Sequence, residues 1–360
     1  MALTQTHPSR SILDDLRACA ACRMPTRVPC LPLGCDFDVR QTPFTHREYR
    51  KDPDKMLALW KLIVAKFDYD WALLFPDDLI EWEFTGIETT DDEWIPPGTM
   101  KYLSATRETL ELLRLPEPAS DGRMPLHLRG LRLLKDHFQD SVCVTGRVAA
   151  PFSAVALVLG VEATLMLMLD DPPLFRDWMA WAERCNEVWI QAQIEAGADA
   201  LWIGDCIATS KFISLDRFRD FALEPAAHTA ALVGRLGALS FYHGNETRVD
   251  YLKTAAANVD ASAINIGEKG DLGVIKAAIG TSRCIMGNLD PVGVLQHGSR
   301  AQVEDATARI VQAGMPGGGY IFCTGEGIPH NTPPENVNAC VATVRRVGGY
   351  DQGCVALRHP

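Results

Sequence analysis

The sequence predicts a single (β/α)8 barrel that spans residues 1–360 and carries an elaborated N-terminal region. Eight short apolar stretches have the composition of buried strands. Helical patterns separate most of these stretches, as in folds built on a parallel sheet. A doubly wound sheet is the alternative, but no Gly-x-Gly-x-x-Gly motif follows a predicted strand. Together these observations favour the barrel.

The N-terminal half contains the first three predicted strands, at 28–34, 71–76 and 141–147. Residues 1–27 form a helical extension, with a helix at 14–23 that ends before Pro25. Further helices are predicted at 52–67, 126–139, 155–170 and 172–196. The segment 80–125 has no regular period and is too long for an ordinary connection, so we expect an excursion near the barrel mouth.

The second half of the chain alternates regularly between strands and helices. Strands are predicted at 197–206, 238–243, 261–266, 283–288 and 319–323. Helices are predicted at 216–236, 249–257, 272–279 and 299–313, with a last one that starts near Thr332. The predicted barrel therefore has its first strand at 28–34 and its eighth at 319–323.

Composition limits the class of protein. Hydrophobic residues make up 47% of the chain and charged residues 22%, which is typical of a globular protein. The formal net charge of −11 argues against a nucleic-acid partner. No apolar window of about 18 residues suggests a membrane helix, and residues 1–10 lack a signal-peptide core. We therefore expect a cytoplasmic protein without a membrane partner.

The eleven cysteines are an odd number spread along the chain, which favours reduced thiols over a disulfide framework. Cys19 and Cys22 form a CxxC pair, with Cys30 and Cys35 nearby. The spacing is irregular and no second CxxC pair follows, so a structural zinc is the less favoured interpretation.

Polar residues are expected at the C-terminal ends of the barrel strands, where chemistry takes place in this fold. In chain order they are Asp77, Asp78, Arg147, Asp205, Cys206, His243, Glu246, Glu268, Asn288, Asp290, Cys323 and Glu326. Acids dominate, with one histidine and two thiols, and such a set suits a divalent metal better than a phosphate. Taken singly, the histidine and the thiols are more often ordinary core or loop residues.

Several motifs of the second half resemble the uroporphyrinogen decarboxylase superfamily. They are Ile203-Gly-Asp-Cys-Ile-Ala208, Gly287-Asn-Leu-Asp-Pro291, Gly317-Gly-Gly-Tyr-Ile-Phe322, Gly327-Ile-Pro and Thr332-Pro-Pro-Glu-Asn336. The resemblance is good over residues 195–345 and loose over the N-terminal half. It implies a (β/α)8 barrel, in agreement with the strand count.

The two branches of this superfamily differ after the first strand. The decarboxylases carry an Arg-Gln-Ala-Gly-Arg type of motif there, whereas this chain has the acidic stretch Leu33-Gly-Cys-Asp-Phe-Asp38. The other branch contains zinc methyltransferases that work with corrinoid proteins and hold zinc through His-x-Cys-Gly and Gly-Cys-Gly motifs. By this resemblance the chain is closer to the methyltransferase branch.

The resemblance also implies a set of site residues. His243 aligns either with the histidine of His-x-Cys-Gly or, as we prefer, with its cysteine in front of Gly244, and Glu326 takes the place of the cysteine in Gly-Cys-Gly. Cys323 is a third candidate ligand, and Glu246 and Cys206 are held in reserve. The implied catalytic residues are Asp205, His243 and Glu326, and the implied cofactor-binding residues are Asn288 and Asp290.

A harder ligand set suits zinc that polarises an oxygen rather than zinc that activates a thiol. The implied function is therefore the transfer of a methyl group from a methoxylated, aromatic-ether substrate to the cobalt(I) of a corrinoid protein. Methylcobalamin:thiol methyl transfer is the alternative, and a decarboxylase-like lyase or a non-catalytic barrel is a second one. A homodimer is left open. Trp82, Trp94 and Phe44 form either an aromatic wall of the site or ordinary packing.

Overall fold

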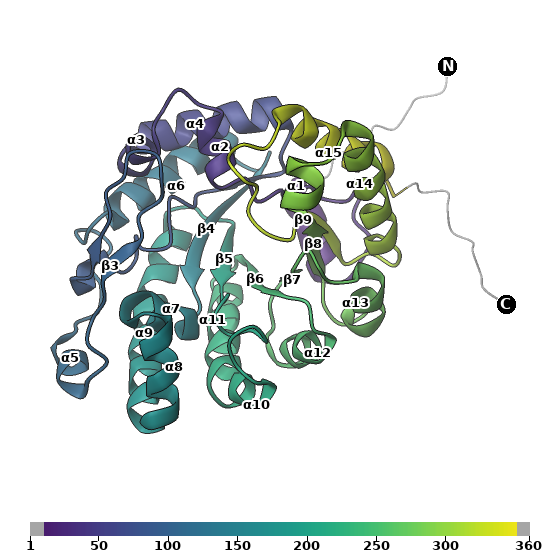
Figure 1. Cartoon of the computed structure of the whole chain (residues 1–360). Helices are drawn as coiled ribbons and strands as arrows, with labels where there is room; N and C mark the ends of the chain where they lie inside the picture. The colour runs from purple at the N-terminus through teal and green to yellow at the C-terminus, as the bar shows by residue number, and fades with distance from the viewer. Residues whose placement is uncertain (1–10, 351–360) are drawn as a thin grey trace, which may run out of the picture.

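The computed structural model describes residues 11–350 and contains a curled parallel sheet surrounded by helices (Figure 1). The expectation for residues 1–10 lies outside the described part. Seven strands pair in the order β1-β4-β5-β6-β7-β8-β9. They are β1 (Trp71–Leu73), β4 (Cys143–Ala149), β5 (Ala200–Gly204), β6 (Leu239–Glu246), β7 (Ala263–Ile266), β8 (Ile285–Leu289) and β9 (Tyr320–Thr324). The predicted fold class is confirmed, because all neighbouring strands of this sheet run parallel.

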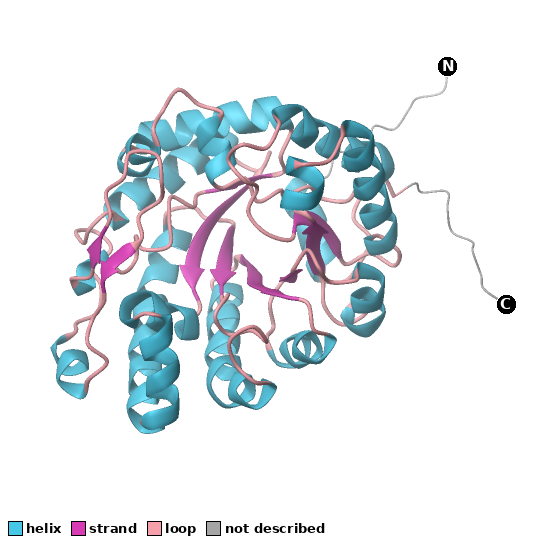
Figure 2. Ribbon diagram, in the orientation of Figure 1, coloured by secondary structure: helices cyan, strands magenta, loops and turns pink. Residues whose placement is uncertain are grey.

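Helices cover the outside of the sheet, as the cyan ribbons around the magenta strands show (Figure 2). They are α1 (Ile12–Ala20), α2 (Asp36–Arg40), α3 (His46–Lys51), α4 (Pro53–Phe67), α5 (Arg107–Leu112), α6 (Met124–Phe138), α7 (Pro151–Leu159), α8 (Val161–Asp170), α9 (Pro172–Glu195), α10 (Leu215–Arg217), α11 (Leu223–Arg235), α12 (Val249–Asn258), α13 (Leu272–Ile279), α14 (Arg300–Gly314) and α15 (Pro334–Val347). A 3₁₀ turn, η1 (Glu83–Thr85), and two π-helical turns, η2 (Phe218–Ala222) and η3 (Pro291–Gln296), complete the helical segments.

The predicted first strand, 28–34, closes the barrel without forming a regular ladder. Leu31 N donates to Phe322 O at 2.8 Å, and Phe322 N donates to Pro29 O at 2.9 Å. On the other side, Asp70 N donates to Cys30 O at 3.0 Å. Two of the residues in this segment are prolines, which have no N–H to continue a ladder. The eighth strand position is therefore occupied, but the prediction of a regular strand there is wrong.

The helix predicted at 155–170 is in fact two helices, α7 and α8. Gly160 separates them with a φ of +86°, a left-handed conformation that glycine adopts without a Cβ clash. No single helix within residues 11–350 is long and apolar enough to span a membrane. α7 and α8 reach that length and composition only as a pair, which is bent by 113°.

The connection from β1 to β4 forms an excursion with its own small hairpin. β2 (Glu88–Thr89) and β3 (Thr99–Lys101) pair antiparallel, and α5 follows them. This arrangement agrees with the irregular composition of 80–125. The hairpin lies at the margin of the molecule in Figure 1.

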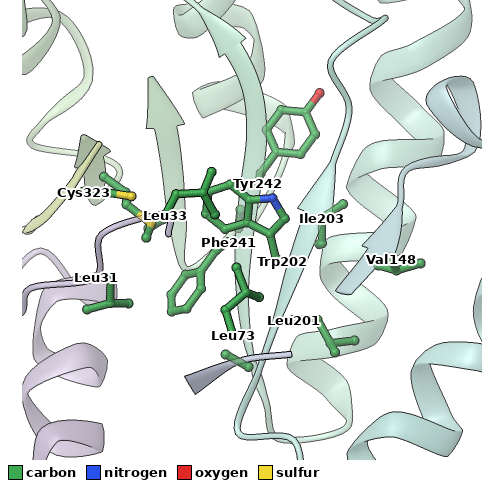
Figure 3. Close-up of a cluster of buried hydrophobic side chains, with 14 of the residues drawn as sticks. Leu31, Leu33, Leu73, Val148, Leu201, Trp202, Ile203, Phe241, Tyr242 and Cys323 are labelled. Atoms are coloured by element: carbon green, nitrogen blue, oxygen red, sulfur yellow. The ribbon is translucent and has the colours of Figure 1, made fainter. Parts of the chain in front are cut away.

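The interior of the barrel is filled by apolar side chains from several strands and from the 28–34 segment (Figure 3). Leu31, Leu73, Trp202 and Phe241 are all buried in this cluster. Barrel interiors of this kind are packed cores rather than pores. The site therefore lies above this packed layer, at the carboxyl ends of the strands.

Candidate functional site

His243 lies near the end of β6 and is held from two sides. It is 4% exposed, and its ring centroid lies 4.7 Å from that of Trp202 on the neighbouring strand β5. Its Nδ1 is 2.7 Å from Oδ1 of Asn265, which belongs to β7 on the other side. Parallel pairing places His243 in register with Asn265 on β7 and with Gly204 on β5, two residues after Trp202.

Asn265 is a site residue that the sequence analysis did not single out. Its Nδ2 donates to Met286 O at 3.3 Å, which turns its Oδ1 toward His243. A carbonyl oxygen only accepts, so Nδ1 of His243 carries the proton and Nε2 faces away from Asn265. A polar residue inside the apolar run Ala263–Ile266 was the available signal.

Glu326 follows β9 and approaches His243 across the mouth. Its Oε2 lies 3.8 Å from Nε2 of His243 and accepts from Asn245 Nδ2 at 2.6 Å. Gly325 precedes it, and a Cβ at Gly325 would lie 2.3 Å from the backbone nitrogen of Glu268. A close backbone approach thus requires glycine in front of Glu326. The structure brings together the predicted pair His243 and Glu326.

The pKa of His243 reflects opposing effects. Burial lowers the pKa, but the charge interaction and hydrogen bond with Cys206, the carboxylate of Glu326 and the hydrogen bond with Asn265 raise it to about 9. An imidazole with this pKa is protonated at neutral pH, and a metal would have to displace its Nε2 proton.

Asp205 is completely buried next to the mouth. Tyr242 Oη donates to its Oδ2 at 2.7 Å, and Ser153 Oγ donates to its Oδ1 at 2.9 Å. Burial raises the pKa of Asp205 to about 6, although both hydrogen bonds and the charge of His243 favour the carboxylate. Asp205 is therefore not part of the cavity lining at the carboxyl ends of β4 and β5. Ser153, which does line that cavity, lies between it and Asp205.

The two candidate thiols have different surroundings. Cys206 is exposed and lies against His243. Cys323 is fully buried in the interior of the barrel, where Figure 3 shows it among apolar side chains. Burial raises the pKa of Cys323 well above its ordinary value, which disfavours the thiolate that a metal needs.

Glu246 is occupied by its own loop. Its oxygens accept from Ser210 N at 2.7 Å, Ser210 Oγ at 2.9 Å, Thr247 N at 2.7 Å and Arg248 N at 2.8 Å. These contacts tie the loop after β5 to the end of β6. Glu246, a reserve candidate for a zinc ligand, thus has its oxygens engaged in holding these loops.

Asn288 and Asp290 likewise hold loops. Asn288 Nδ2 donates to Gly267 O at 2.9 Å and to Gly270 O at 2.8 Å. Asp290 caps η3 through backbone N–H groups and pairs with Lys269 Nζ at 2.9 Å. Their predicted role in cofactor binding stays a prediction.

The described side chains do not form a complete zinc site. Within residues 11–350, no three His, Cys, Asp or Glu side chains gather as a metal site requires. His243 and Glu326 face each other, but the third implied ligand, Cys323, lies in the core. Zinc therefore stays a prediction.

A cavity of about 350 Å³ opens beside Cys206 at the carboxyl ends of β4 and β5; neither His243 nor Glu326 is part of its lining. Its lining is mostly apolar and comprises Asp78, Leu79, Pro97, Gly98, Thr99, Tyr102, Arg147, Ala149, Ser153, Ala156, Leu157, Val161, Gly204, Cys206 and Ile207. The 97–102 segment of the excursion forms one side of it. This volume is within the range of small-molecule sites, near its lower end.

The aromatic residues considered for the wall of the site pack elsewhere. Trp82 is buried 5.7 Å from the Trp181 ring, and Trp94 lies under Arg40. Phe44 lies beside Lys55. The aromatic side chain that does line the cavity is Tyr102.

Asn265 provides a test of how His243 is positioned. We expect Asn265→Ala to lower kcat of the reaction at this site by about 10- to 100-fold, the usual cost of losing a residue that orients a functional histidine. Asn265→Asp keeps an acceptor for Nδ1 and should retain more of the rate. Equal rates for Asn265→Ala and the unmodified protein would exclude this positioning role.

Comparison with protein families gives a match over nearly all of the described chain. The model of the uroporphyrinogen decarboxylase (URO-D) family matches residues 13–347. Uroporphyrinogen decarboxylase from Syntrophotalea carbinolica is 27% identical over 310 residues, covering 83% of this chain and 86% of that protein. The enzyme of the same name from Rhodococcus erythropolis is 25% identical over 364 residues, covering 94% and 98%.

Solved structures with this fold include a methyltransferase from Methanosarcina mazei. It superposes with a TM-score of 0.84 at 20% sequence identity, covering 93% of this chain and 98% of that one. A B12-independent methionine synthase from Shewanella sp. W3-18-1 gives a TM-score of 0.52 at 9% identity, covering 81% and 88%. At these identities the similarity concerns the fold.

Proposed function

The chain belongs to the uroporphyrinogen decarboxylase (URO-D) family, and within it we propose that the protein is a methyltransferase. In this proposal it takes a methyl group from a methoxylated, aromatic-ether substrate and delivers it to the cobalt(I) of a corrinoid protein. The observation that carries the proposal is the pair His243 and Glu326 at the barrel mouth, beside a mostly apolar cavity.

The region after the closing segment argues against decarboxylation. α2 occupies this region, where the decarboxylase branch is expected to carry arginines. Its one arginine, Arg40, lies over the Trp94 ring at 4.6 Å. Asp38 is buried on the same helix, and both of its oxygens lack a hydrogen-bond partner among the described residues. A polycarboxylate substrate therefore finds no basic cluster on α2.

The residues of this chain have distinct roles in the proposed reaction. The cavity holds the aromatic ring and excludes water from it. The methyl carbon leaves the ether oxygen and bonds to cobalt, which supplies two electrons and becomes methylcobalt(III). The oxygen leaves as a phenolate or alkoxide and is finally protonated. His243, held by Asn265, and Glu326 lie next to this cavity rather than in its lining, and Cys206, which does line it, lies against His243. In this proposal the pair stabilises the charge that develops on that oxygen at the edge of the cavity.

Zinc would act as a Lewis acid toward this oxygen if it were bound there. His243 and Glu326 are the residues implied as its ligands, but the described side chains do not complete the set. No step above depends on zinc. Metal analysis of the purified protein, repeated with His243→Ala, decides whether the chain carries zinc.

The direct test is spectroscopic. The protein is mixed with a reduced corrinoid protein and a methoxylated aromatic compound, in parallel a carboxylate and its neutral analogue, and the conversion of cobalt(I) to methylcobalt(III) is followed by absorbance. We expect conversion with the ether and formation of the demethylated phenol in equal amount. If methylcobalamin methylates only thiols and no ether donates a methyl group, the thiol methyltransferase alternative replaces this proposal.

A further inference from the structure

Arg147 is a buried cation in the lining of the cavity. It lies in β4, its side chain is 2% exposed, and its guanidinium carbon lies 5.1 Å from the Phe75 ring centroid. Nη1 contacts Glu81 Oε2 at 3.2 Å, and Nη2 contacts Asp78 Oδ1 at 3.1 Å. Nε is buried and has no hydrogen-bond partner among the described residues. One N–H of a cavity-lining cation is thus unsatisfied.

An unsatisfied buried N–H of a charged group is costly and calls for a ligand or a functional explanation. Nε and Nη2 lie on the same edge of a guanidinium, and this edge matches the two oxygens of a carboxylate. In Arg147 the edge is occupied through Nη2 alone. A carboxylate that contacted both nitrogens would satisfy it completely.

The two acidic partners of Arg147 differ in how firmly they are held. Glu81 is 2% exposed, and its oxygens also accept from Ala149 N at 2.8 Å and from Trp189 Nε1 at 3.1 Å. Asp78 is 58% exposed on its side chain and lines the cavity. Asp78 can therefore move into water at small cost, whereas Glu81 stays in place.

We propose that the cavity binds a substrate that carries a carboxylate, with both oxygens on Nε and Nη2 of Arg147. The carboxylate of the substrate replaces that of Asp78, which swings into solvent. The charge next to the guanidinium is unchanged by this exchange, so the ligand gains a bidentate contact without adding a new repulsion. Asp78 is a built-in competitor that lowers the affinity for anions.

The rest of the lining fits the remainder of such a molecule. Leu79, Leu157, Val161 and Ile207 provide an apolar wall for a single aromatic ring. Together with the proposed function, on which this step rests, the substrate class is a methoxylated aromatic carboxylate. Arg147 is then the residue that distinguishes a carboxylate from a neutral analogue.

The test compares 4-methoxybenzoate with the neutral 4-methoxybenzamide, which has nearly the same shape. Binding is measured by calorimetry without a corrinoid protein. We expect the carboxylate to bind at least about tenfold more tightly, as a charge-assisted bidentate contact implies. Arg147→Met should abolish this preference.

Asp78→Asn should change the affinity for the carboxylate in the direction opposite to Arg147→Met. Because the Asp78 side chain is 58% exposed, this variant should fold normally. It should tighten binding of 4-methoxybenzoate by about threefold or more and leave 4-methoxybenzamide unchanged. Asp216→Asn is the matched control, since it removes the same charge from a side chain that is 88% exposed outside the cavity lining.

Equal binding of the acid and the amide, or no tightening in Asp78→Asn, overturns the proposal. The two proposals fail separately. Binding with the expected preference but no methyl transfer refutes the proposed function alone. Methyl transfer from neutral ethers and carboxylates alike refutes the carboxylate site alone.

Discussion

His243→Ala should lower kcat/KM for methyl transfer by about 100- to 1,000-fold, because it removes a polar group from the place where the leaving oxygen develops charge. Nε2 of His243 faces Glu326 at 3.8 Å, and Asn265 and Trp202 fix the ring in that orientation. Alanine leaves the pocket beside Cys206 without this group. The measurement is the rate of methylcobalt(III) formation under saturating corrinoid protein.

Glu326→Gln should act in the same direction with a smaller effect. Glutamine keeps the length of the side chain and an oxygen for Asn245 Nδ2, but it removes the negative charge near His243. For His243→Ala the matched control is His228→Ala, since His228 is 63% exposed and contacts Glu183 outside the barrel. An unchanged rate in His243→Ala would show that the mouth of the barrel is not the site of the reaction.

The second large expected effect is on stability, because Asp70 holds the barrel closed. Arg27 donates to both of its oxygens at 2.7 Å, Cys30 N donates at 2.7 Å, and Arg345 of α15 donates at 2.8 and 3.0 Å. Asp70 is 5% exposed on its side chain and directly precedes β1. One carboxylate thus joins the closing segment, β1 and the last helix.

Asp70→Asn should lower the free energy of unfolding by about 3 kcal/mol, the lower end of the cost of breaking a buried ion pair from one side. The lower end applies because Arg27 and Arg345 are 38% and 20% exposed and can be hydrated in part. Urea unfolding measures the change. Asp68→Asn is the control, since Asp68 also binds Arg345 but is 74% exposed, and it should cost at most about 1 kcal/mol.

This contribution has a defined pH dependence. Burial alone would raise the pKa of Asp70, but the hydrogen bonds and charges of Arg27 and Arg345 outweigh it and lower the pKa. A group with a depressed folded-state pKa stabilises the fold above its unfolded-state value, which is about 3.9 for aspartate. The difference between the unmodified protein and Asp70→Asn should therefore be constant near neutral pH and shrink below about pH 4. A difference that already disappears at pH 6 would contradict this assignment.

Much of the fold was accessible from the sequence, because its signals are local. Apolar runs such as Ala263–Ile266 and Ile285–Leu289 fit strands that are buried on both faces. Helices between them follow from periodicity and caps, such as Ser299 before α14. The closing segment was predicted as a strand on the same grounds, but its prolines prevent regular pairing.

The candidate site was accessible only in part. His243 and Glu326 are 83 residues apart and were paired by resemblance, which the structure supports with a distance of 3.8 Å. Residue spacing gave no indication that Cys323 is buried in the core. Successive side chains of a strand point to opposite faces of the sheet, and only the strand register decides which face a given residue takes. Asn265, buried within an apolar strand, was missed for the same reason.

The sequence by itself determined a parallel barrel and a set of polar residues at its strand ends, since periodicity and chain order are properties of short segments. Only the tertiary structure decided which of these residues face one another. It oriented His243 through Asn265, committed Glu246 to its own loop and left Nε of Arg147 without a partner beside the cavity. These features depend on contacts between segments far apart in the chain. Such contacts arise from strand register and loop packing, which no local pattern specifies.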